Sequence, residues 1–423
     1  MWQTSPMSES ADSASFSNDV SAAGATETGD SPVGFVPLRN DEERLRQLVD
    51  WLEEHVSAYG FVRAGIPIGV SLEEVQRLRI ETNAMGARLP DEIIHASMMV
   101  LGAAVNHTSP YLAYADGTVT VTEDSVSPLD VPWAYPGDIP EGAAAALVPD
   151  ASVTNVDSSS AIPVRVFTPT DPTGAVVVAA HGGGFWMGNG AVRDNSFAPN
   201  MAALAARSGA IVVDVDYRLA PEYHPEAAAA DIACVVAAVS SNVLQLPGLV
   251  NDSFSSDNPI VVFGQSSGAH CALRAVMSEG LLSIPLALLL LTPPLDLSQL
   301  PPVYLEAIFG PGAKPDSAVV SPGIHPLSRP LRVHVQSSTH DEIVPPADSF
   351  LAAVTAAGGI ASQSSFLATH QIATPAEQRR RITDAAQFIL EVTDTQRELP
   401  ADPLGEYDKE EIDRRNEATW GRS

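Results

Sequence analysis

The sequence predicts an α/β fold with a mostly parallel, eight-stranded sheet that carries helices on both faces. From about residue 152 onward, apolar runs of strand length alternate with segments of helical periodicity. This alternation is typical of a parallel sheet that is buried on both sides. With 423 residues, of which 45% are apolar, the chain can build one large domain with additional segments.

Four segments are expected along the chain. Composition separates a disordered acidic tail (1–36), an N-terminal helical and wrapping segment (37–150), the α/β domain (151–395) and a charged C-terminal tail (396–423). The first segment contains eight serines, five acidic residues and no Lys or Arg. It therefore cannot bury enough apolar surface to offset its chain entropy.

The N-terminal segment is expected to be mainly helical. Its predicted elements are three helices, an edge strand and a wrapping loop: 41–59, 71–85, 91–105, 117–122 and 127–150. The first helix has an apolar stripe of Leu45, Leu48, Val49, Leu52 and Val56. Ser71 and Glu74 have the spacing of a capping box, which predicts where the second helix begins.

The α/β domain alternates between the two element types in chain order. Short apolar runs predict strands at 162–168, 175–180, 210–216, 260–264, 286–292, 331–337 and 364–368. Amphipathic or Ala-rich stretches predict helices at 196–208, 226–239, 267–278, 346–357 and 377–392. Between 297 and 320, only Val303 to Phe309 is long enough for a helix, because prolines and glycines surround it.

Net charge excludes several kinds of partner. The chain has 52 acidic and 23 basic residues, a formal net charge of −29, and Lys314 and Lys409 are its only lysines. Such a surface repels phosphate backbones and anionic lipid, so no nucleic-acid partner is expected. Nothing in the sequence indicates an oligomeric state.

The cysteines and the apolar runs bear on metal sites, membrane spans and cellular location. Cys234 and Cys271 lie in apolar stretches without a metal-ligand or disulfide pattern, so we expect no metal and no cofactor. No apolar run reaches 18 residues, and the N-terminus has no signal-peptide pattern. We therefore expect no membrane span and, by default, a cytoplasmic location.

The sharpest motif is Gly-Gln-Ser-Ser-Gly at residues 264–268. It follows a predicted apolar strand and opens a predicted helix, which is the setting that a nucleophile elbow requires. The glycines permit a tight turn that exposes the Ser266 hydroxyl, and the helix N-terminus favours developing negative charge. A structural turn is the alternative, since the pattern alone is common.

A second motif, His-Gly-Gly-Gly-Phe-Trp, follows another predicted strand at residues 181–186. Its glycines let backbone N–H groups approach a ligand, and a phosphate loop would need a Walker lysine that is absent. The amides of Gly183, Gly184 and Ser267 are predicted to form an oxyanion hole. His181 is expected to support the loop, although its residue type also suits a general base.

Together with the block Asp-Tyr-Arg-Leu-Ala-Pro-Glu at 216–222, these motifs resemble the hormone-sensitive-lipase-like branch of the α/β-hydrolases. The resemblance covers about 152–392. It implies an α/β-hydrolase fold, an N-terminal helical cap over the active site, and a carboxylester hydrolase with a Ser–Asp–His triad in that chain order. Phe185 and Trp186 would then line the pocket and pack against a small acyl group.

The same resemblance assigns the remaining triad members. Asp341 follows the predicted strand at 331–337, where the family carries its acid; Glu342 and Asp348 are the alternatives. The base should follow the last strand, which selects His370, and His340 is its rival. Because His340 adjoins Asp341 at a strand end, it is poorly placed to pair with that carboxylate and also reach Ser266.

Some residues depart from the family pattern. Gln265 stands where the family usually has an acid, Ala269 replaces a glycine, and Pro345 replaces a second acid. The expected function is a serine carboxylester hydrolase (EC 3.1.1) on small, short-chain acyl esters. Two alternatives stay open: a deacetylase, amide or lactone hydrolase on the same triad, and a non-catalytic ligand-binding homologue.

Overall fold

The computed structural model describes residues 41–56, 65–101, 118–127, 161–249, 254–255, 259–278, 281, 283–298, 300–310 and 330–399. The predicted acidic tail, nearly all of the wrapping loop and all but the first four residues of the predicted C-terminal tail lie outside these ranges. The segment boundaries themselves therefore stay predictions.

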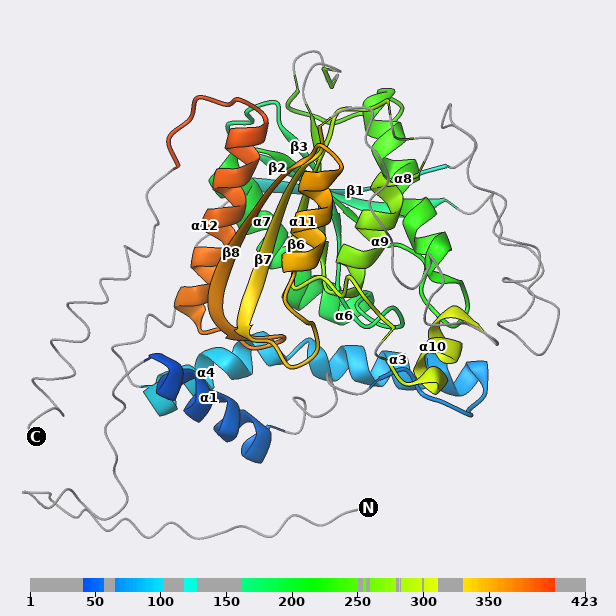
Figure 1. Ribbon diagram of the computed structural model, residues 1–423, viewed down its shortest axis with the longest axis vertical. Coiled ribbons are helices and arrows are strands. Elements are labelled where there is room, and N and C mark those ends of the chain that lie inside the picture. Colours follow the sequence, from blue (N-terminus) through cyan, green and yellow to red (C-terminus); the bar gives the residue numbers. More distant parts are fainter. Residues whose placement is uncertain are drawn as a thin grey trace, which may run out of the picture.

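An eight-stranded, mostly parallel sheet forms the centre of the molecule, as predicted (Figure 1). Its spatial order is β1 (Val119–Val126), β2 (Ile162–Pro169), β4 (Ile211–Val215), β3 (Val176–Ala180), β5 (Ile260–Gln265), β6 (Leu286–Leu291), β7 (Arg332–His340) and β8 (Ile360–Thr369). β1 and β2 run antiparallel to their neighbours, and the other strands are parallel.

The last strand is longer than the sequence predicted. β8 spans ten residues, whereas only its apolar end at 364–368 was expected. Its first half, Ile360 to Ser365, is mostly exposed at the sheet edge and pairs with β7 through the backbone. Polar residues on an exposed edge carry little periodic signal, which explains the shorter prediction.

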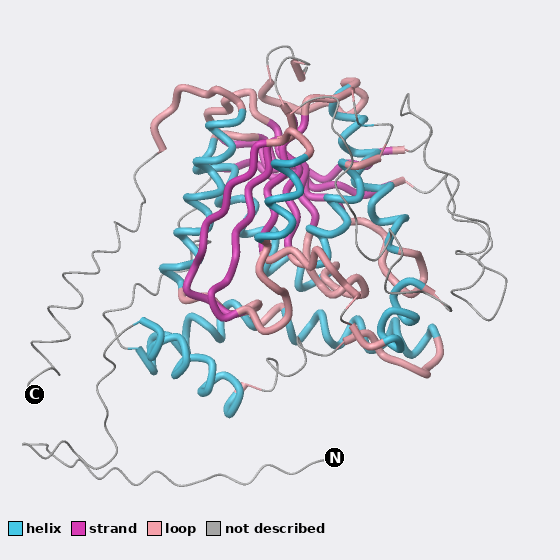
Figure 2. The backbone as a smooth tube through the Cα atoms, in the orientation of Figure 1, coloured by secondary structure: helices cyan, strands magenta, loops and turns pink. Residues whose placement is uncertain are grey.

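Helices cover both faces of the sheet (Figure 2). One face packs against α7 (Ala198–Ser208) and α12 (Pro375–Val392), and the other against α8 (Pro225–Ser240), α9 (Ser267–Val276) and α11 (Asp348–Ala356). Within β3, Val176 and Val178 belong to one core while Val177 and Ala179 belong to the other. This alternation explains why the central strands read as continuous apolar runs.

The helix predicted from residue 196 has an irregular beginning. Before α7 come the short α6 (Gly190–Val192) and a π-helical turn, η3 (Arg193–Phe197). Arg193 is buried and donates from Nε to Asp214 Oδ2 over 2.8 Å, which ties this turn to the end of β4. A buried ion pair between distant residues cannot be read from local periodicity.

The N-terminal helices α1 (Asp41–His55), α3 (Leu72–Gly86) and α4 (Leu89–Leu101) lie below the sheet in Figure 1, at the end where β7 finishes. The predicted stripe of α1 is buried: Leu45, Leu48 and Leu52 share a core with Ile372, which follows β8. Ser71 caps α3 and accepts a 3.2 Å hydrogen bond from the Glu74 amide, as predicted.

No described helix is long and apolar enough to cross a bilayer. The cytoplasmic location stays a prediction.

Candidate active site

Ser266 lies at a sharp turn between β5 and α9. Its backbone has φ 50° and ψ −123°, a region that residues with a side chain seldom occupy and that marks a strained turn. The flanking glycines allow neighbouring backbone to pass close to the turn. A Cβ on Gly268 would lie 2.2 Å from the His181 carbonyl oxygen, and a Cβ on Gly264 would lie 2.4 Å from the Ala269 Cα. The turn therefore has the geometry of a nucleophile elbow.

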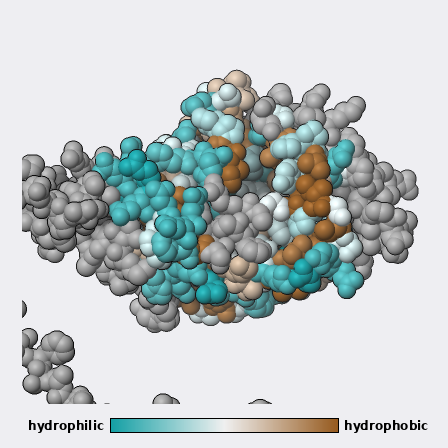
Figure 3. Space-filling model, turned by 90° about the horizontal axis from the view of Figure 1, so that it is seen from below, coloured by the Kyte–Doolittle hydropathy of each residue, from teal (hydrophilic) through white to brown (hydrophobic). Residues whose placement is uncertain are grey.

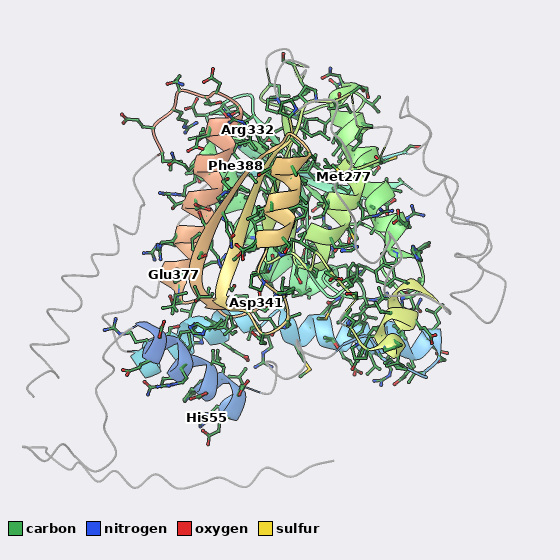
Figure 4. The ribbon with its side chains drawn as sticks, in the orientation of Figure 1. His55, Met277, Arg332, Asp341, Glu377 and Phe388 are labelled. Atoms are coloured by element: carbon green, nitrogen blue, oxygen red, sulfur yellow. The ribbon has the colours of Figure 1, made fainter. Side chains whose placement is uncertain are left out.

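Three side chains form one hydrogen-bonded line at the ends of three parallel strands. Ser266 Oγ lies 2.9 Å from His370 Nε2, and His370 Nδ1 lies 2.9 and 3.1 Å from the two oxygens of Asp341. A carboxylate only accepts, so Nδ1 carries the proton and Nε2 accepts from the serine hydroxyl. Figure 4 shows Asp341 at the lower end of β7, just above the N-terminal helices.

Asp341 is held in its ionised form. Burial by itself would raise the pKa of Asp341, but the hydrogen bond from His370, the positive charge of that ring when it is protonated, and the backbone amides outweigh burial and lower it. The amides of Ile343 and Val344 also donate to Oδ1, over 2.9 and 2.8 Å. With its side chain 8% exposed, Asp341 is a fixed, ionised acceptor for the imidazole.

The three rival residues have other places in the structure. His340 is exposed at the end of β7, and Asp348 is exposed in the first turn of α11. Glu342 accepts a 3.3 Å hydrogen bond from the backbone amide of His370. Sequence reasoning missed this contact, which holds the main chain beside the imidazole, because nothing in the sequence pairs residues 342 and 370.

Residues 182–188, called the glycine loop from here on, pass directly beside Ser266. A Cβ on Gly182 would lie 3.2 Å from the Ser266 Cβ. Gly183 and Gly184 have φ of 138° and 59°, and a Cβ on Gly183 would lie 2.0 Å from the Met187 carbonyl oxygen. Ser267 is the first residue of α9, so its amide lies at a helix N-terminus, where anions are stabilised.

His181 supports this loop from inside. Its ring stacks on Tyr217 with centroids 4.3 Å apart, and Tyr217 Oη donates to the His181 carbonyl oxygen over 2.5 Å. Burial lowers the pKa of His181 to about 4, so the ring stays neutral at physiological pH. The contribution of Tyr217 was missed, although its signal is present in the Asp216–Glu222 block.

A cavity of about 530 Å³ opens above Ser266 and His370, a size that suits a small-molecule ligand. Phe185 and Trp186 lie in its wall and are themselves almost fully buried, at 6% and 1% exposed. The Phe185 ring packs against Phe309 with centroids 5.7 Å apart. Figure 3, which views the molecule from this side, shows apolar side chains gathered on the right half of the face.

Two separate segments close the cavity. The helices α3 and α4 and the segment before α3 contribute Gly65, Ile66, Thr82, Asn83, Gly86 and Leu89. Residues around α10 (Pro302–Phe309) contribute Leu297, Leu300, Pro301, Tyr304 and Ile308. The short helix expected at 303–309 is present as α10 and contributes Tyr304 and Ile308 to the wall.

Within the described part of the chain, no group of three or more His, Cys, Asp and Glu side chains could hold a metal ion. The two cysteines are buried, and burial raises the pKa of Cys234 to about 12 and that of Cys271 further.

A comparison with known protein families matches part of the chain that carries this geometry. Residues 177–359, from β3 through the segment after α11, match a family model described as the alpha/beta hydrolase fold. The matched stretch includes Ser266 and Asp341, and His370 lies beyond its end. The resemblance inferred from the three motifs is thereby confirmed, as is the fold class.

Known relatives of this α/β-hydrolase include esterases. Over 125 residues it is 36% identical to carboxylesterase NlhH of Mycobacterium tuberculosis, a match that covers 29% of this chain and 35% of the relative. The match therefore spans about a third of that curated relative.

Two solved structures share the fold. An esterase of Pyrobaculum calidifontis superposes with a TM-score of 0.54 at 18% identity, covering 79% of this chain and 97% of that one. Esterase LipW from Mycobacterium marinum gives 0.52 at 19% identity, covering 83% and 97%. At such identities the likeness establishes the architecture only.

Proposed function

We propose that this α/β-hydrolase is a serine carboxylester hydrolase that acts on small, short-chain acyl esters through an acyl-enzyme intermediate. The observation that carries the proposal is the unbroken line from Ser266 through His370 to Asp341, beside a cavity that Ser266 and His370 line. The carboxylesterase name of the curated relative supports the same class of reaction.

In the proposed reaction, Ser266 Oγ attacks the acyl carbonyl while its proton passes to His370 Nε2. Asp341 keeps the imidazole in the required tautomer and stabilises the imidazolium that forms. His370 then returns the proton to the alcohol oxygen, which leaves. A water molecule, deprotonated by His370, cleaves the acyl-enzyme and releases the carboxylic acid.

The negative charge of the tetrahedral intermediate needs donors on the carbonyl side. We assign this role to the backbone amides of Gly183, Gly184 and Ser267, because the glycine loop and the α9 N-terminus both border Ser266. In comparable sites each such donor contributes about 10²–10³-fold to the rate. Phe185 and Trp186 are assigned to the wall that packs against the acyl group.

Amide, lactone or deacetylase chemistry would use the same residues in the same order, and binding without turnover would leave Ser266 unreactive. Values of kcat/KM for a panel of esters, lactones and amides show which of these reactions the chain catalyses best. Reaction of Ser266 with a fluorophosphonate separates all of them from a binding-only homologue.

The deciding experiment is fluorophosphonate labelling followed by peptide mapping. We expect one adduct, on Ser266, and loss of both labelling and hydrolysis in Ser266→Ala, with melting temperature little changed. Ser278→Ala, just beyond the other end of α9, is the matched control and should label like the wild type. An unlabelled wild type, or an adduct on another serine, contradicts the proposed nucleophile.

A further inference from the structure

Arg79 of α3 reaches from the N-terminal helices into the glycine loop. It is 9% exposed. Its Nε donates to the Trp186 carbonyl oxygen, and Nη2 donates to the Ala220 carbonyl oxygen over 2.7 Å. Its Nη1 and Nη2 donate to the two carboxylate oxygens of Glu222 over 2.6 and 2.5 Å. A bidentate pair of this kind fixes both direction and distance.

Asn83 lies one turn further along the same face of α3 and is 6% exposed. Its Oδ1 accepts from the Gly188 amide over 3.1 Å, and its Nδ2 donates to Asn189 Oδ1 over 2.7 Å. The two side chains therefore hold the loop at Trp186 and at Gly188. Both contacts come from one rigid helix more than 100 positions earlier in the chain.

The same stretch of loop is fixed from a second side. The Ala220 amide donates to the Phe185 carbonyl oxygen over 2.9 Å, and Arg79 binds the carbonyl of that same Ala220. Inside the loop, the amides of Trp186 and Met187 both donate to the Gly183 carbonyl oxygen. In a planar trans peptide, the C=O group and the N–H group of the next residue point in opposite directions. The two hydrogen bonds to the Gly183 carbonyl oxygen therefore set the direction of the Gly184 N–H.

We infer that Arg79 and Asn83 are positioning residues for the oxyanion hole, so that α3 contributes to the chemical step and not only to closing the pocket. This inference rests on the proposed esterase function. Without its contacts to α3, the loop would retain its glycines, but the N–H groups of Gly183 and Gly184 would no longer be held in a fixed direction. Donors contribute to catalysis when they are pre-organised toward the developing charge.

The test uses the full chain with four variants. Asn83→Leu removes both contacts of Asn83, whereas Asn83→Asp keeps the acceptor for the Gly188 amide. Arg79→Met combined with Glu222→Met removes the ion pair without leaving one charge buried alone. Arg77→Gln is the matched control, because Arg77 is half exposed on the same helix and pairs with Glu74 and Glu81 of that helix.

In Asn83→Leu and in the double variant we expect kcat for p-nitrophenyl acetate to fall about 10–100-fold, with KM within about threefold. Affinity for a trifluoromethyl ketone, which forms an oxyanion on Ser266, should fall by a similar factor. Asn83→Asp should recover part of kcat, and Arg77→Gln should match the wild type.

Hydrogen exchange of the peptide spanning 182–190 provides a readout that needs no turnover. Exchange should accelerate in Asn83→Leu and in the double variant, and not in Arg77→Gln. Folded variants with wild-type kcat and unchanged exchange overturn the inference, as does a rise in KM alone. A wild type that hydrolyses no ester would overturn the proposed function instead, while the exchange result would still test the hold of α3 on the loop.

Discussion

Ser266 shows how one residue can depend on contacts that its own neighbours in sequence do not make. Its left-handed backbone is maintained because the glycines around it let β5, α9 and the end of β3 approach within contact distance. Its hydroxyl is useful only because His370, 104 residues later, lies 2.9 Å away. Strained conformations persist where surrounding packing over-determines them, and they gather at active sites.

The choice between the two histidine candidates, His340 and His370, gives a prediction at this scale. His370→Ala should lower kcat/KM for p-nitrophenyl acetate by about 10³–10⁴-fold or more, because the serine loses its base. His340→Ala should change it less than about threefold, since that side chain is exposed at the end of β7. Steady-state kinetics on the two purified variants decides, and the reverse order would remove His370 from the triad.

At the scale of elements, α12 is tied to the last two strands of the sheet, β7 and β8, by a polar cluster centred on Asp384. Its carboxylate accepts from His334 Nε2 over 2.8 Å, Gln336 Nε2 over 2.7 Å and Ser364 Oγ over 2.6 Å. Burial by itself would raise the pKa of Asp384, but the bonds from His334, Ser364 and Gln336 outweigh burial and lower it. The cluster therefore joins α12, β7 and β8 through one charged group.

A carboxyl group whose folded pKa is lowered stabilises the fold above its unfolded pKa, near 3.8, and loses that contribution as pH falls further. Asp384→Asn should therefore lower the free energy of unfolding at pH 7 by about 1–3 kcal/mol. The deficit should shrink below about pH 3.8. Urea unfolding at several pH values measures it, with Glu391→Gln on the same helix as control. A deficit that is equal at pH 7 and pH 3 would show that Asp384 acts through packing alone.

At the scale of the whole molecule, the cavity is enclosed by parts of the chain that lie far apart in sequence. The backbone near Gly65 lies so close to α10 that a Cβ there would be 2.6 Å from the Tyr304 ring. Ile66, at 3% exposed, packs into the main core beside it. These contacts form a roof over this part of the pocket, which Gly65, Ile66 and Tyr304 line.

We expect this roof to limit the length of the acyl chain that the pocket accepts. A methylene contributes about 0.8 kcal/mol when it is buried and nothing when it stays in water, so kcat/KM for p-nitrophenyl esters should peak at acetate to butyrate and decline by octanoate. Tyr304→Ala should raise octanoate relative to acetate, while Val303→Ala, 44% exposed on the same helix, should not. A wild-type optimum at dodecanoate would contradict a closed roof.

Much of the architecture could be predicted from the sequence alone. Apolar runs of strand length have one stable arrangement when helices separate them, so the strands, their parallel packing and the helices α7 to α12 followed from periodicity. The elbow was predicted at Ser266 because glycines flank a serine between an apolar run and a helix. The apolar stripe of α1 and the cap of α3 at Ser71 were equally local signals.

Tertiary structure alone decided which distant groups meet. Nothing in the sequence pairs Arg79 with Glu222, Asn83 with Gly188, or Asp384 with His334, because each pair is joined by long-range packing. The polar half of β8 could likewise not be predicted from the sequence, since this exposed part of the edge strand is held by backbone hydrogen bonds to β7 and not by an apolar face. Periodicity records which side of an element is buried, and only the folded chain determines what it is buried against.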